Sequence, residues 1–178
     1  MLILASASPR RREILESAGI AFEVRPADIC EMLLLHETAE EHVQRLAEAK
    51  ARVVWQTGDT VLGADTVVVV DKVLLGKPSD DEEATRMLRL LSERRHRVLT
   101  GICFFDGSKA ETALEETLVE FLPLSDEEIA TYVATGEPFD KAGAYGIQGA
   151  ASKFVARIEG CYFNVVGLPI SRVYSFIR

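Results

Sequence analysis

The stretch Val61-Leu62-Gly63-Ala64-Asp65-Thr66-Val67-Val68-Val69-Val70 decides the fold of this chain. Its β-branched and apolar residues predict a strong strand inside a sheet. Asp65 interrupts the apolar run, and a carboxylate buried there is costly unless a cation or a metal ion lies beside it. Gly63 permits close approach of a backbone or a ligand near Asp65. The alternative is an Asp at the end of a strand that accepts hydrogen bonds from backbone amides.

Around this strand, helical and strand patterns alternate early in the chain, and hairpins dominate later. The 3.6-residue period and the helix start signals predict helices at Pro9–Ala18, Glu40–Gln56, Ser79–Glu93, Asp126–Ala134 and after Pro169. Further strands are predicted at Leu2–Ala5, Phe22–Arg25, Arg97–Phe105, Ala110–Phe121 and Phe154–Ile158, with more strand after Gly160 up to Val166. This order favours a mixed α/β sheet over an all-parallel one.

Size and charge restrict the class of protein. The 178 residues are 48% hydrophobic and 27% charged, which predicts one globular domain over residues 1–178, divided into two lobes at most. A net charge of −8 argues against a general nucleic-acid-binding surface. No apolar run approaches the ~20 residues of a membrane span, and Arg10 to Arg12 cut the N-terminal apolar stretch short, so we expect a cytoplasmic protein.

Cysteine and histidine spacing restricts the metal chemistry. Cys30, Cys103 and Cys161 are odd in number and form no Cys-x-x-Cys pair, so neither a disulfide framework nor a zinc site is indicated. A metal ion in this protein would be a hard one held by carboxylates.

The first predicted helix begins unlike the others. Two helices begin with the acidic capping boxes Ser79-Asp-Asp-Glu82 and Ser125-Asp-Glu-Glu128, whereas the first begins with Ser8-Pro9-Arg10-Arg11-Arg12. Cations at a helix N-terminus oppose the helix dipole, typically by ~0.3–1 kcal/mol each. A charge run often only faces water, but this placement favours an anion site made of free amides and arginines.

Three further polar residues lie in unusual places. Lys50 falls in the middle of the buried stripe of the second helix, so it either snorkels to solvent or reaches a cleft and holds phosphate. Lys77 precedes the helix at Ser79, in a loop too short for a Walker A motif. Gln148 lies in a glycine-rich loop over 140–149, where it either caps backbone groups or reads a base edge.

Six blocks together closely resemble the Maf family over nearly the whole chain. They are Ser6-Ala7-Ser8-Pro9-Arg10-Arg11, Leu46-Ala47-x-x-Lys50-Ala51, Gly63-Ala64-Asp65-Thr66, Gly76-Lys77-Pro78, Asp140-Lys141-Ala142-Gly143-Ala144-Tyr145-Gly146-Ile147-Gln148-Gly149 and Gly167-Leu168-Pro169. The resemblance implies a mixed, bent β-sheet with flanking helices around a central cleft, similar to inosine triphosphate pyrophosphatases. It also implies hydrolysis of a nucleoside triphosphate to the monophosphate and pyrophosphate, and a homodimer.

Residue roles also follow from the resemblance. Asp65 resembles the family's proton acceptor, and the phosphate-binding set comprises Ser8, Arg11, Lys50 and Lys77. Arg10, Thr66 and Gln148 resemble the branch that acts on dTTP and UTP. Mg²⁺ or Mn²⁺ is expected on Asp65 and Glu31, although Cys30-Glu31 stands where the family often has Asp-Glu.

The expected mechanism is in-line attack of an activated water on the α-phosphorus, assisted by Lys50 and Lys77. Asp65 serves either as the base or as a metal ligand. Two alternatives remain: a non-catalytic nucleotide-binding regulator of septum formation, and a 7-methyl-GTP pyrophosphatase.

Overall fold

The computed structural model describes residues 1–178 and contains one seven-stranded mixed sheet with flanking helices. The strands are β1 (Leu2–Leu4), β2 (Glu23–Val24), β3 (Thr60–Val70), β4 (Val73–Leu75), β5 (Arg95–Phe105), β6 (Ala110–Phe121) and β7 (Val155–Glu159). Their order is β2-β1-β3-β5-β6-β7, and β4 pairs with β3 outside this path. Parallel β1–β3 pairing and antiparallel β6–β7 pairing confirm the predicted mixed α/β class.

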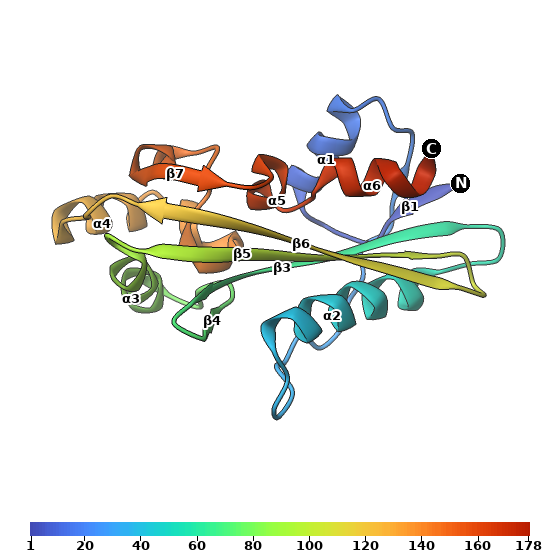
Figure 1. Cartoon of the computed structure of the whole chain (residues 1–178), viewed down its shortest axis with the longest axis horizontal. Coiled ribbons are helices and arrows are strands. Elements are labelled where there is room, and N and C mark those ends of the chain that lie inside the picture. Colours follow the sequence, from blue (N-terminus) through green and yellow to red (C-terminus); the bar gives the residue numbers. More distant parts are fainter. The chain divides into compact units, whose positions relative to one another are not determined.

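Six α-helices accompany the sheet (Figure 1). They are α1 (Pro9–Ser17), α2 (Ala39–Val54), α3 (Asp81–Leu91), α4 (Asp126–Val133), α5 (Tyr162–Val166) and α6 (Ile170–Ile177). Three short 3₁₀ segments follow α4, namely η1 (Glu137–Asp140), η2 (Ala142–Ala144) and η3 (Ala150–Phe154). None of the helices combines the length and the apolar character that crossing a bilayer demands.

The chain folds into two compact units. Unit 1 comprises Met1–Thr66, Leu99–Glu115 and Gly167–Arg178, and unit 2 comprises Val67–Val98 and Glu116–Val166. The long strands β3, β5 and β6 therefore each contribute residues to both units.

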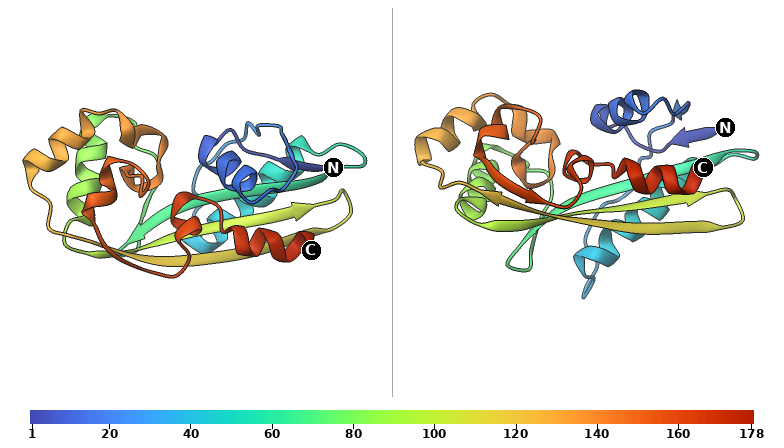
Figure 2. Two further views of the ribbon diagram at one scale, coloured as in Figure 1. Left: turned by 90° about the horizontal axis from the view of Figure 1, so that it is seen from above. Right: turned by 45° about the horizontal axis from the view of Figure 1, so that its top comes forward.

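In unit 1, α2 covers one face of the strands, and α1 and α6 lie on the other face (Figures 1 and 2). Two glycines let α2 approach closely, because a Cβ at Gly63 would overlap the Ala47 carbonyl and one at Gly101 would overlap the Val43 carbonyl. A buried cluster that includes Ile3, Val61 and Phe105 fills the space between them. The close packing of α2 on β3 is what brings the residues described below together.

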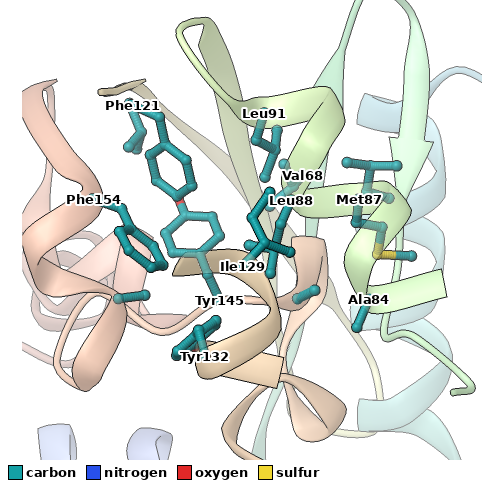
Figure 3. Close-up of a cluster of buried hydrophobic side chains, with 14 of the residues drawn as sticks. Val68, Ala84, Met87, Leu88, Leu91, Phe121, Ile129, Tyr132, Tyr145 and Phe154 are labelled. Atoms are coloured by element: carbon teal, nitrogen blue, oxygen red, sulfur yellow. The ribbon is translucent and has the colours of Figure 1, made fainter. Parts of the chain in front are cut away.

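In unit 2, a cluster of buried aliphatic and aromatic side chains forms the core (Figure 3). Phe121, Tyr145 and Phe154 meet edge to face, with the Phe121 and Tyr145 ring centroids 4.7 Å apart. His96 is buried among them and bonds the Tyr145 hydroxyl through Nε2 at 2.8 Å. Burial lowers the pKa of His96 to about 4, so this imidazole is neutral at pH 7.

The structure corrects three predicted features. The segment before Val166 is the helix α5 and not a strand, because the Asn164 amide donates to the Val98 carbonyl and to Thr117, which holds a helical turn there. The strand β4 was not predicted. The cap of α3 is Asp80, which accepts a hydrogen bond from the Glu83 amide, so the predicted box at Ser79 is displaced by one residue. The capping box at Ser125 is confirmed.

Candidate functional site

Lys50 links two carboxylates within unit 1. Its Nζ lies 2.7 Å from Asp65 Oδ1 and 2.5 Å from Glu31 Oε1. The Lys50 and Asp65 side chains are only 9% and 10% exposed, whereas the Glu31 side chain is 48% exposed. The prediction that a positive group lies beside Asp65 is therefore confirmed, and Lys50 points inward and does not snorkel to solvent. Asp65 lies in the middle of β3 and not at its end.

The packing of α2 on β3 explains the contact between Lys50 and Asp65. Lys50 shares the buried face of α2 with Leu46 and Ala47, and that face packs on β3 at Gly63, so the ammonium is directed at the strand that carries Asp65. A second ion-pair network holds the loop that carries Glu31. Arg45, one turn before Lys50 on α2, donates to both Glu37 oxygens and to the Met32 carbonyl. Hydrogen bonding from Arg45 lowers the pKa of Glu37 to about 2.

The turn between β1 and α1 is organised by Ser6. Ser6 Oγ accepts hydrogen bonds from the Ser8 amide and from Arg11. Ser8 occupies the N-cap position of α1, as predicted, but its side chain makes no capping bond, and the first turn carries no acidic residue. The Ser8 hydroxyl therefore caps no amide of α1 and can donate to an anion.

Arg11 makes four hydrogen bonds within unit 1. Nε donates to the Gly167 carbonyl at 2.8 Å, and Nη1 donates to Ser6 Oγ at 3.1 Å and to the Ala64 carbonyl at 2.9 Å. Nη2 donates to Thr66 Oγ1 at 3.1 Å. Burial lowers the pKa of Arg11, and the charge of Asp65 opposes that shift. Four of the five guanidinium N–H groups are thus engaged with the protein.

Of the remaining predicted site residues, Thr66 and Arg10 lie in unit 1, and Lys77 and Gln148 lie in unit 2. Thr66 is half-buried, and its hydroxyl also bonds Thr100 at 2.9 Å. Arg10 is half-buried in the first turn of α1. Lys77 and Gln148 belong to unit 2 and are exposed. The structure thus brings Lys50, Asp65 and Glu31 into direct contact within unit 1, and Arg11 joins Thr66 there.

A family profile described as Maf-like protein matches residues 1–178. The chain belongs to the Maf family. Close relatives of this Maf member bear the name dTTP/UTP pyrophosphatase in several bacteria. The protein of Koribacter versatilis strain Ellin345 is 52% identical over 179 residues, covering 99% of this chain and 93% of the relative. The protein of Geobacter sp. strain M21 is 53% identical over 181 residues, which cover 99% of this chain and 94% of the relative. The protein of Geobacillus sp. strain WCH70 is 51% identical over 179 residues, which cover 99% of this chain and 96% of the relative.

Among solved structures, the Staphylococcus aureus Ham1 protein aligns with this Maf member at a TM-score of 0.45 and 18% sequence identity. The alignment covers 70% of this chain and 72% of that one.

The donor set of the Maf member fits a hard divalent ion. Asp65 and Glu31 supply two carboxylates that both contact Lys50, and no group of three or more His, Cys, Asp or Glu residues is arranged to hold a metal ion. Mg²⁺ suits such a sparse set, because it usually takes one or two carboxylates and completes its shell with water and substrate phosphates.

Local sequence patterns indicate no role for three residues of this region: Ser6, Arg45 and Gly167. Ser6 and Gly167 stand inside blocks that resemble the family, so the signal was present but pointed to no specific contact. Arg45 lies five positions before Lys50, and nothing local indicates that it holds the loop that carries Glu31. In the glycine-rich loop, the glycines make room for neighbouring side chains, since a Cβ at Gly146 would overlap Lys141 and one at Gly149 would overlap Glu137.

Proposed function

We propose that this chain is a nucleoside triphosphate pyrophosphatase that hydrolyses dTTP and UTP to the monophosphate and pyrophosphate. The observation that carries the proposal is the buried ammonium of Lys50 between Asp65 and Glu31, in a chain about half identical to dTTP/UTP pyrophosphatases over nearly its full length. We place this activity in the cytoplasm. A homodimer is a prediction from the family resemblance.

Lys50 has two tasks in this proposal. An ammonium has three donors, and two of them are directed at Asp65 and Glu31, which leaves one for a phosphate oxygen. The same positive charge attracts the two neighbouring carboxylates and orients them. Ser8 supplies a further donor for the phosphate chain, because its hydroxyl makes no capping bond at the start of α1. Such preorganised donors stabilise the charge of a transferring phosphoryl group.

Asp65 accepts the proton of the attacking water or binds the metal ion. In the reaction, the water oxygen bonds to the α-phosphorus, the bond to the bridging oxygen breaks, and pyrophosphate leaves. Asp65 and Glu31 would hold Mg²⁺ or Mn²⁺, which neutralises phosphate charge when bound. For Lys77 and Gln148 the family resemblance alone supports a role, in phosphate binding and base choice respectively. Arg10 and Thr66 are proposed to take part in base choice on the same ground.

The test is pyrophosphate release from dTTP, UTP, CTP, the purine triphosphates and 7-methyl-GTP, with Mg²⁺ or Mn²⁺. We expect turnover of dTTP and UTP and its loss in Asp65→Asn, whose amide neither accepts a proton nor binds the metal as a carboxylate does. Preferred turnover of 7-methyl-GTP would reassign the substrate. Nucleotide binding without turnover of any substrate would contradict the enzyme and support a regulatory role. Nucleotide binding that persists without metal would favour Asp65 as the base.

A further inference from the structure

The guanidinium of Arg11 joins three segments of unit 1 that lie far apart in the sequence. It contacts the turn before α1 through Ser6, strand β3 through Ala64 and Thr66, and the start of the last segment through Gly167. The most distant of these partners is 156 residues away. All four acceptors are neutral carbonyl or hydroxyl oxygens.

Two of these bonds flank Asp65. Arg11 holds the backbone carbonyl of the residue before Asp65 and the side chain of the residue after it. The Thr66 hydroxyl is fixed further by Thr100. A strand held on both sides of one residue directs the side chain of that residue, so the orientation of Asp65 toward Lys50 depends on Arg11.

We propose that Arg11 is a positioning residue for Asp65 and not a ligand of the substrate phosphates. The proposal rests on the proposed function, since positioning is measured by turnover. It departs from the role that the family resemblance suggested for this arginine. The physical reason is that a guanidinium with four N–H groups engaged has one left, whereas phosphate recognition by arginine typically uses two parallel bonds.

Arg11→Lys separates the two roles. Lysine keeps the positive charge, but its three donors radiate from a single atom and cannot reproduce a planar fork that reaches three segments. A phosphate ligand would therefore tolerate lysine in part, whereas a positioning residue would not. The matched control is Arg172→Met, which removes a guanidinium of unit 1 whose side chain is 55% exposed and paired with Glu115.

The first measurement is kcat and KM for dTTP, together with the inhibition constant of pyrophosphate, in wild type, Arg11→Lys and Arg172→Met. We expect kcat of Arg11→Lys to fall about 100-fold, as for a catalytic group displaced by about 1 Å. KM and the pyrophosphate constant should stay within about threefold, because ground-state phosphate contacts are unchanged. A pyrophosphate constant raised about tenfold or more with kcat retained would overturn the proposal.

The second measurement does not depend on activity. Amide hydrogen exchange should become faster in Arg11→Lys at residues 64–66 and 167–168, and should be unchanged there in Arg172→Met. Unchanged exchange at these segments in Arg11→Lys would refute the positioning role, whatever the kinetics. If wild type does not hydrolyse dTTP, the proposed function fails, and exchange still decides whether Arg11 holds β3. Should Arg11→Lys not fold, Ser6→Ala removes one acceptor of Arg11, and hydrogen exchange at residues 64–66 should again become faster. Unchanged exchange at these residues in Ser6→Ala would refute the positioning role.

Discussion

The pair formed by Lys50 and Asp65 should contribute far more coupling energy than an exposed pair at the same distance. At 2.7 Å and an effective dielectric constant of ~20, the Coulomb attraction is about 6 kcal/mol before desolvation is subtracted. The pair formed by Arg89 and Asp126 has nearly the same separation, 2.8 Å, but its side chains are 59% and 77% exposed. At the dielectric constant of water, ~80, that attraction is only about 1.5 kcal/mol.

The assay is urea unfolding at pH 7 of Lys50→Met, Asp65→Asn and the double variant. We expect Lys50→Met to lower the free energy of unfolding by about 3–5 kcal/mol, because it leaves the Asp65 carboxylate buried without its cation. The loss of unfolding free energy in the double variant should be about 2–3 kcal/mol smaller than the sum of the losses in the two single variants. The same cycle on Arg89→Met and Asp126→Asn should give a coupling below about 1 kcal/mol. Equal coupling in both cycles would refute the argument from burial.

Two further stability predictions follow from close packing and from a buried imidazole. Gly63→Ala should lower the free energy of unfolding by about 3 kcal/mol, because its Cβ overlaps the α2 backbone, whereas Gly76→Ala, with open space around it, should change that free energy by less than about 1 kcal/mol. Similar urea midpoints for the two variants would contradict this. The pKa of His96 falls from 6.5 to about 4 on folding, so its stabilising contribution is complete above pH 6.5 and is lost as the pH falls toward 4. Between pH 7 and pH 5, the free energy of unfolding of wild type should therefore fall by about 2 kcal/mol more than that of His96→Phe. Equal falls in urea titrations of the two proteins would show that His96 is not the cause.

Local patterns predicted most of the elements because each pattern reports a property of its own segment. The buried stripe of α2 and the apolar run of β3 identified both elements and marked Lys50 and Asp65 as polar residues in apolar places. The prediction was wrong before Val166, where β-branched residues indicated a strand. Contacts of Asn164 with residues far away in the sequence stabilise a helix there, and tertiary contacts outweigh propensities of a few tenths of a kcal/mol per residue.

The sequence by itself determined the α/β class, the helix start without an acidic cap, and the presence of a buried carboxylate that requires a cation. Only the tertiary structure decided which cation meets it. Lys50 and Asp65 are 15 residues apart, and Arg11 and Gly167 are 156 apart. The periodicity of a segment reveals which face is buried but not which residue lies opposite, because that partner is selected by the packing of α2 on β3 through Gly63. For the same reason, the sequence could not reveal that Arg11 donates to four oxygens of the protein itself.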